Sequence, residues 1–363
     1  MKNLMDWFKK LVRKPLFLPL FSVFLVLIIN VVYDAVQGNN AFEFFKLELK
    51  EGALYGRIID ILNRGSEAAI LAIGMTLVVS SSAGTDISVG SVMSLAGSLC
   101  CMLLAGFGVT HVREIGDLQM PIFIGVIAGI AIAGLCGVFN GFLVAKMKIQ
   151  PMVATLIFFT AGRAIGLLLT NNKMVYIHLD EFKVFGGKLW IFPTPTVIAV
   201  ICIAIMVLIL KTTSFGMYVQ SVGINPKASR IAGINSVAII LLCYVICGLF
   251  SGVAGIVATS RIYSADSNNI GLNLELDAIL AVALGGNSLG GGRFNLAGSI
   301  IGAYTIQAIT TTMYALGVAK AQAPVYKAII VILIVVVQSP VVKAYFAHRR
   351  AQKYSRLALA GRG

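Results

Sequence analysis

An apolar stretch with a polar, glycine-rich interruption, Leu71 to Gly97, constrains the fold of this chain most strongly. Its flanks are apolar enough for a membrane, but its centre, Ser80 to Gly90, reads SSSAGTDISVG. Backbone that faces lipid must satisfy its own hydrogen bonds, so a broken helix is tolerated only against protein or along a water-filled path. Half-helices that meet near the midplane are a common way to build a solute site. The stretch therefore predicts a membrane protein and favours a role in transport.

Composition agrees with a membrane protein. The chain has 363 residues, of which 58% are hydrophobic and 12% are charged. Soluble domains are about half apolar and about a quarter charged. Each spanning helix needs about 20 predominantly apolar residues, and the apolar runs predict about ten spans, some of them broken by Gly-rich segments. These spans are expected at residues 15–33, 66–81, 90–107, 120–145, 151–170, 195–210, 237–260, 274–288, 296–316 and 324–340.

The charge distribution predicts the orientation of these spans. If the N-terminus is cytoplasmic and the spans alternate, more than half of the 29 Lys and Arg residues fall on inner segments, and most acids fall on outer ones. Cytoplasmic loops carry such an excess of Lys and Arg. We therefore expect an all-α polytopic protein with both termini in the cytoplasm. We expect a single transmembrane domain, residues 1–363, with a basic N-terminus (1–14) and a basic tail (341–363).

This orientation also accounts for the net charge of +14, which then faces anionic lipid on the inner side. No nucleic-acid partner is expected. The longest outer segment, residues 34–65, contains FKLELKE, which alternates apolar and charged residues. A helix or strand lying on the membrane surface and an ordinary solvated loop are both compatible with this pattern.

The largest inner loop, residues 211–236, has room for a structured element. Asn225 and Pro226 are suited to cap and start a short helix, because Pro is favoured at the first helical position. Gly233 is suited to end it. This short helix would present Lys227 and Arg230 to the cytoplasm.

Two sets of charged residues lie inside the apolar runs. Asp86 is the sole acid in the first break, and it fits either a helix cap for the third span or a proton relay. Arg163 lies in the fifth span, where an isolated charge costs about 2.5–3.5 kcal/mol. We expect it to form an ion pair with Glu275 or Asp277, at the start of the eighth span.

Other patterns exclude function classes. The glycine run 285–293 lacks the Lys-Ser or Lys-Thr pair that a phosphate-binding loop needs, so no ATP site is expected in this chain. The six cysteines lie in apolar runs, and no cluster of ligands suggests a metal or a catalytic site. Five GxxxG pairs predict close helix packing. They are Gly125/Gly129, Gly137/Gly141, Gly162/Gly166, Gly248/Gly252 and Gly298/Gly302.

Three motifs, in order, resemble the ribose-type ABC importer permeases. SAGTDISVGSVMSLAG resembles the family signature GGIDLSVG, GINPKASRIAGI resembles the loop that contacts the ATPase, and LELDAILAVALGGNSLGGGRFNLAGSIIGA resembles a late segment. The resemblance covers residues 59–339 and is most like the galactofuranose branch. The signature departs at Ala83, Thr85 and Ile87, within the break, so the exact sugar stays open.

The resemblance implies a fold similar to the vitamin B12 importer permease and a role in monosaccharide import (galactofuranose, ribose or a related sugar) across the bacterial inner membrane. It implies three partners: a separate ATPase subunit that binds ATP and Mg²⁺, a periplasmic sugar-binding protein, and a second permease copy or paralogue. The coupling loop would act through Gly223, Asn225, Pro226, Lys227, Ala228, Arg230 and Gly233, and the translocation path would pass Gly84, Thr85, Asp86, Ser88 and Gly90.

Two transport classes compete with this interpretation. A secondary transporter driven by an ion gradient would need several buried acids near the midplane, and the sequence suggests Asp86 nearly alone. A passive channel would need a continuous polar stripe, which the predicted spans lack. We expect no metal ion or cofactor to bind this chain. We expect membrane lipid to surround it.

Overall fold

The computed structural model describes residues 16–36, 43–50, 53–319 and 322–338. The predicted basic termini, 1–14 and 341–363, lie outside the described residues. The chain divides into two compact units, Met1–Thr311 and Thr312–Gly363. The second unit contains the end of α13 and the whole of α14.

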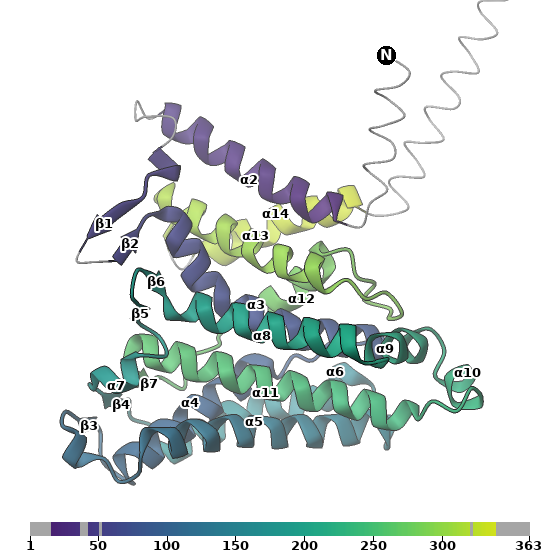
Figure 1. The fold of residues 1–363 in the computed structure, drawn as a ribbon, viewed down its shortest axis with the longest axis horizontal. Coiled ribbons are helices and arrows are strands. Elements are labelled where there is room, and N and C mark those ends of the chain that lie inside the picture. The colour runs from purple at the N-terminus through teal and green to yellow at the C-terminus, as the bar shows by residue number, and fades with distance from the viewer. Residues whose placement is uncertain (1–15, 37–42, 51–52, 320–321, 339–363) are drawn as a thin grey trace, which may run out of the picture. The chain divides into compact units, whose positions relative to one another are not determined.

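A helix lies at each of the ten predicted spans (Figure 1). Five of them are long and apolar enough to cross a membrane, namely α3, α5, α6, α8 and α11. The ten helices are α2 (Phe17–Val36), α3 (Arg57–Ser82), α4 (Val89–Ala105), α5 (Ile122–Ala145), α6 (Pro151–Leu169), α8 (Thr194–Thr212), α11 (Ser236–Ile262), α12 (Leu274–Leu284), α13 (Leu296–Ala315) and α14 (Ala323–Gln338).

Short elements occupy the connections between these helices. They are η1 (Glu43–Phe45), β1 (Glu48–Lys50), β2 (Ala53–Tyr55), β3 (His111–Val112), η2 (Ile115–Asp117), β4 (Val175–Ile177), α7 (Asp180–Lys183), β5 (Lys188–Leu189), β6 (Phe192–Pro193), α9 (Phe215–Ile224), α10 (Pro226–Ile231) and β7 (Ser264–Ala265).

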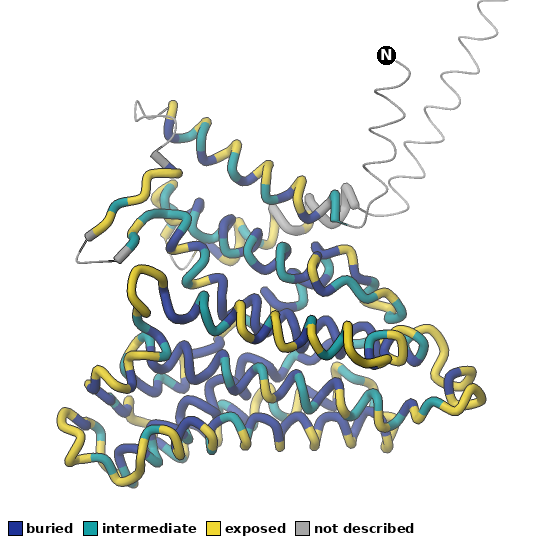
Figure 2. The backbone as a smooth tube through the Cα atoms, in the orientation of Figure 1, coloured by how far each residue is buried: buried dark blue, intermediate teal, exposed yellow. Residues whose placement is uncertain are grey.

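Helix α3 forms the centre of the first unit. It packs against α8, α9, α11 and α12. Its most apolar 18-residue window is 94% buried, whereas the corresponding window of α6 is 22% buried. Figure 2 shows the exposed edges of α5 and α8 in yellow, and their side chains there are large and apolar, for example Phe123 and Leu208. Such apolar surface faces lipid or another protein rather than water.

The predicted close approach of glycine-rich helices is confirmed between α5 and α11. A Cβ atom at Gly137 would collide with the carbonyl oxygen of Tyr244, and one at Gly248 would collide with that of Ala133. Two helices whose backbones meet in this way gain van der Waals contact that lipid cannot replace. Figure 1 shows α11 lying along α5 over most of its length.

Four of the connections predicted on the outer side, all in the first unit, lie together. β4 pairs in parallel with β3 and antiparallel with β7, so three connections form one small sheet. The amide of Leu54 donates to the carbonyl of Ile191 at 3.2 Å, which adds the connection before α3 to the same group.

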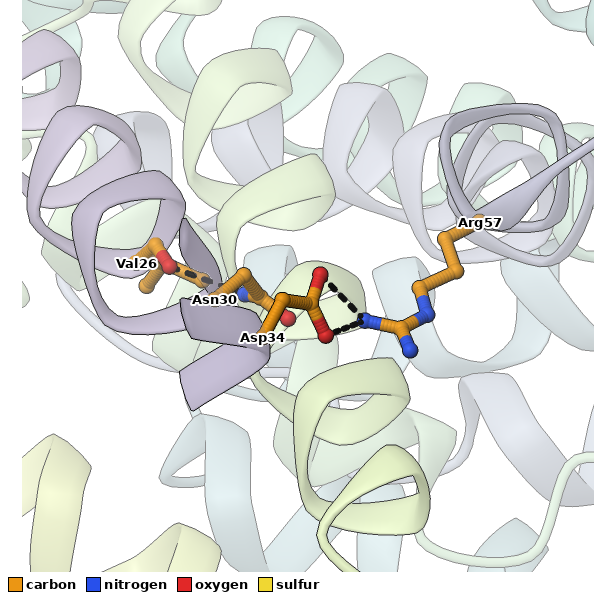
Figure 3. A network of polar contacts seen from close by, with 4 residues as sticks. All are labelled: Val26, Asn30, Asp34 and Arg57. Carbon is orange, nitrogen blue, oxygen red and sulfur yellow. Dashed lines mark hydrogen bonds and ion pairs between the residues drawn. The ribbon is translucent and has the colours of Figure 1, made fainter. Parts of the chain in front are cut away.

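The segment 34–65 combines one of the expected alternatives with an unexpected feature. It contains a β1–β2 hairpin, in agreement with the strand interpretation, but α3 begins at Arg57, nine residues before the predicted span. The early start has a partner: the guanidinium of Arg57 donates to both oxygens of Asp34, at 2.9 and 3.1 Å (Figure 3). Asp34, near the end of α2, is fully buried, so this ion pair joins α2 to α3.

Candidate functional site

The predicted first break is present and buried. Helix α3 ends at Ser82, Ala83 takes a left-handed conformation with φ of 54°, and α4 begins at Val89. Thr85, Asp86 and Ser88 are each no more than 5% exposed. Most of this non-helical backbone is thus enclosed by protein, which is the condition under which a membrane tolerates it, and Ala83, at its start, is exposed.

Close packing fixes both ends of the break. A Cβ atom at Gly84 would collide with Pro151, the first residue of α6. One at Gly90 would collide with the Glu275 carboxylate and with the carbonyl of Gly271. The predicted path residues Gly84 and Gly90 therefore allow neighbouring elements to approach, and they do not border open space in this conformation.

Asp86 holds the turn that leads into α4. Its Oδ1 accepts hydrogen bonds from the amide of Ser88 at 2.9 Å and from the Ser88 hydroxyl at 2.6 Å. The Nδ2 group of Asn140, on α5, donates to the same hydroxyl at 2.9 Å. The N-cap residue of α4 is Ser88, so Asp86 fixes the cap residue instead of bonding the first helical amides.

The glycine run after α12 forms a second break. Helix α12 ends at Leu284, four residues before its predicted end, because Gly286 takes a positive φ of 83°. Asn287 and Asn295 hold this reversal: the amide of Asn295 donates to Asn287 Oδ1 at 2.6 Å, and Asn287 Nδ2 donates to the Ser299 hydroxyl at 2.8 Å.

The loop 211–236 contains the predicted short helix. Helix α10 starts at Pro226, and Asn225 Oδ1 accepts from the amides of Lys227 and Ala228, both at 3.0 Å. Gly233 follows with a φ of 83°, and the chain turns into α11. The local prediction is therefore confirmed. Helix α9, which precedes it, was not expected.

Helix α10 presents an exposed surface of mixed character. Lys227 and Arg230 are exposed, as expected, and Ile231 is 90% exposed. Ile224, just before the helix, is 74% exposed as well, so the end of α9 and α10 together expose apolar and basic side chains. The sequence analysis missed Ile231 because it weighed only the charged residues of the loop.

Three segments that the sequence analysis singled out meet at Ser80, in the last turn of α3. The amide of Gly292 donates to the Ser80 carbonyl at 3.0 Å, and the Ser80 hydroxyl donates to the Arg293 carbonyl at 2.8 Å. Gly223, in α9, lies against the same Ser80 carbonyl, where a Cβ atom would collide with it. We call Ser80, Gly223 and Gly292 the α3 junction.

The expected ion pair of Arg163 with Glu275 or Asp277 is not formed. The Arg163 guanidinium donates instead to three backbone carbonyls of the segment before α12, at 2.9, 2.8 and 3.1 Å; these belong to Ser267, Asn268 and Ile270. These carbonyls lack helical partners, so they need a donor, and a guanidinium supplies several in a fixed fork. The charge is therefore satisfied by backbone, and it anchors a non-helical segment to α6.

One buried ion pair escaped the sequence analysis. Arg261, near the end of α11, binds the carboxylate of Glu67 on α3 at 2.7 Å, and the Glu67 side chain is 5% exposed. Glu67 lies within the second apolar run. An acid at such a position needs a basic partner, so the sequence already indicated an ion pair here. The described residues therefore hold more buried acids than Asp86, including Asp34, Glu67, Glu275 and Asp277.

Comparison with known proteins places these features in a family. The family described as "Branched-chain amino acid transport system / permease component" matches residues 57–338. The galactofuranose transporter permease protein YtfT of Escherichia coli is 44% identical over 82% of this chain and 83% of its own length.

Two further relatives cover similar or larger shares. The fructose import permease protein FruF of Bifidobacterium longum is 33% identical over 98% of this chain and 97% of its own length. The ribose import permease protein RbsC of Escherichia coli is 33% identical over 78% and 85%, respectively. No solved structure matches the chain. This chain is thus a member of the branched-chain amino acid transport system permease family, and within it resembles the ribose-type sugar permeases.

Proposed function

We propose that this chain is the membrane permease subunit of an ABC importer for a monosaccharide, a multi-pass protein of the inner membrane. The relatives that match it over most of its length are named for galactofuranose, fructose and ribose. A small neutral sugar is the shared element of these names. Galactofuranose remains the first sugar to test, because the permease named for it is the most similar of these three.

The α3 junction is the observation that carries the mechanism. An importer of this kind needs a part that meets the ATPase and a connection from that part to the translocation path. Helices α9 and α10 would be the part that meets the ATPase. The contact of Gly223 with Ser80, one turn before the break, would be the connection to the translocation path. A rigid movement of α9 would therefore displace the end of α3 directly.

The grouping of connections supports alternating spans. The four connections predicted as inner lie together: residue 84 contacts Pro151, and Ser80 contacts both Gly223 and Gly292. Four of the five connections predicted as outer lie together in and around the β3–β4–β7 sheet, and the fifth, residues 317–323, belongs to the second unit. Ten spans, cytoplasmic termini and a fold like the vitamin B12 importer permease follow from this proposal.

The proposal includes partners. A separate ATPase subunit would receive α10 through Ile231, Lys227 and Arg230, and it would supply the ATP and Mg²⁺ sites. A sugar-binding protein would dock on the opposite side, and a second permease copy or paralogue would cover part of the exposed apolar surface of the helices.

Reconstitution tests the proposal. The chain, its partner ATPase and the binding protein are placed in proteoliposomes, and uptake of labelled galactofuranose, ribose and fructose is measured with internal ATP. We expect uptake that requires ATP and the ATPase and that survives collapse of ion gradients. Uptake by this chain alone, driven by a pH gradient, would contradict the proposal.

A secondary transporter is the second candidate, and the buried acids are the observation in its favour. Two of them are committed to arginine, since Asp34 binds Arg57 and Glu67 binds Arg261. Asp86 is held by Ser88. These contacts give three of the acids a structural role, which weakens the second candidate, and the gradient-collapse experiment separates the two.

A further inference from the structure

A cavity of about 400 Å³ lies at the end of α3 opposite to the junction. Its wall is formed by β2, by the first two turns of α3, and by the segment from α7 to β6. Asp60 lines the cavity and Ser80 belongs to the junction; 20 residues along one helix separate them by about 30 Å. The cavity and the junction are thus one hydrocarbon thickness apart. If α10 faces the cytoplasm, the cavity opens on the outer side.

The walls of this cavity, which we call the α3 cavity, are tied together by hydrogen bonds. The amide of Leu54 donates to the carbonyl of Ile191 at 3.2 Å, and the amide of Thr194 donates to the carbonyl of Gly187 at 3.0 Å. Binding pockets for small molecules have volumes of about 300–1,000 Å³ and combine apolar walls with a few polar groups. Ile59, Ile191 and Pro193 provide apolar wall in the α3 cavity.

Two side chains of the α3 cavity, Asp60 and Asn63, can accept hydrogen bonds from a ligand. Asn63 Oδ1 is buried and has no hydrogen-bond partner. The carboxylate of Asp60 is exposed and, among the described residues, has no ion-pair partner within 4 Å. A buried acceptor without a donor costs about 1–3 kcal/mol, so a rotation of the Asn63 amide that brings Oδ1 to a ligand donor would stabilise the complex.

A third side chain supplies a donor. The ammonium of Lys183 lies 4.8 Å from the centre of the Tyr263 ring and lines the cavity. Its contact with the Tyr263 hydroxyl raises the pKa of Lys183, so the group stays charged at neutral pH. Tyr55, half exposed, adds an aromatic ring and a hydroxyl to the wall.

These groups match adjacent hydroxyls better than an anion. Lys183 and Lys188 both line the cavity and would attract an anion, but a fully ionised phosphate group only accepts hydrogen bonds and would meet the carboxylate of Asp60. A sugar hydroxyl both donates and accepts, so it can use the acceptors and the donors of this lining. We propose that the α3 cavity binds a neutral monosaccharide, with Asp60 and Asn63 accepting from its hydroxyls and Lys183 donating to them. The choice of a sugar rests on the proposed function. The cavity would then hold the solute between its release from the binding protein and its passage through the membrane.

Binding to the intact chain in lipid nanodiscs tests this inference. Saturation-transfer NMR is recorded with ribose, galactose and fructose, and with L-leucine and glycerol 3-phosphate as competing chemistries. We expect signals from one or more sugars. Loss of the acceptor in Asn63→Leu, or of the negative charge in Asp60→Asn, should weaken binding by about 3- to 10-fold. Glu181→Gln is the matched control, because Glu181 is an exposed carboxylate in the first turn of α7 and does not line the cavity.

Asp60→Asn keeps the test usable if Asn63→Leu fails to fold, since Asp60 is exposed. The inference is overturned if no sugar binds, if both variants bind as well as Glu181→Gln, or if leucine or glycerol 3-phosphate binds more tightly than every sugar. ATP-driven uptake that persists without binding to this cavity would leave the proposed function standing and remove only this site.

Discussion

Gly223 offers the sharpest test of the α3 junction. Its backbone is helical, so alanine is sterically allowed there and would gain up to about 1 kcal/mol in helix propensity. However, the added Cβ would collide with the carbonyl oxygen of Ser80. A carbonyl in a packed helix cannot rotate away, so α9 must move from α3 or strain must remain.

The magnitude follows from a matched pair. Overpacking costs about 1–3 kcal/mol. Gly216 lies in the same helix, and a Cβ there would meet only the flexible Leu210 side chain, at 3.1 Å. The helix-propensity gain is the same in both alanine variants, so Gly223→Ala should be about 1–3 kcal/mol less stable than Gly216→Ala. The larger Gly223→Val should be less stable still.

The assay has two readouts. Thermal unfolding of the purified variants should give a transition a few degrees lower for Gly223→Ala than for Gly216→Ala. ATP-dependent uptake in proteoliposomes should fall in Gly223→Ala and remain in Gly216→Ala. Equal transition temperatures and equal uptake in the two variants would refute the proposed contact between α9 and the end of α3.

Further predictions concern three other features. Ile231→Ser should lower transport-coupled ATP hydrolysis without changing the unfolding temperature, because Ile231 is 90% exposed; unchanged coupling would move the ATPase contact elsewhere. Glu67→Met should cost about 3–5 kcal/mol in a thermal unfolding assay, and adding Arg261→Met should recover most of the loss; a double variant no better than the single one would argue against the ion pair. Exchanging Arg163 and Asp277 should not restore the assembly lost in Arg163→Asp, since the guanidinium binds carbonyls; rescue, measured as folded protein in membranes, would reinstate the ion pair.

The sequence sufficed where a local rule decides the structure. Hydropathy located all ten helices within a few residues, apart from the start of α3. The capped helix α10 followed from Asn225, Pro226 and Gly233, each of which acts on its own neighbours. The break at residues 83–88 was visible because polar and glycine residues interrupt an apolar run.

Partners across the fold could not be predicted in the same way. Arg163 was expected to pair with a carboxylate. Its partner depends on which groups lie within reach in the fold, and backbone carbonyls of the segment before α12 accept from it instead. The pairs Arg57–Asp34 and Arg261–Glu67 join residues far apart in the chain, so no spacing rule reveals them. The α3 junction likewise needs three remote segments to meet, and sequence motifs identify the segments but not their contact.

The burial of α3 on every side from Gly65 to Ser81 has a consequence for how its sequence can vary. Successive residues of an α-helix are turned by about 100°, so one inserted residue rotates everything beyond it by that angle. On a helix with a lipid-facing side, such a rotation moves some apolar side chains between protein and lipid, which are both apolar surroundings. In α3, 26 residues long, it would turn the side chains beyond the insertion away from their present neighbours. Natural lineages should therefore keep the length of this helix constant and place their insertions in the hairpin before it.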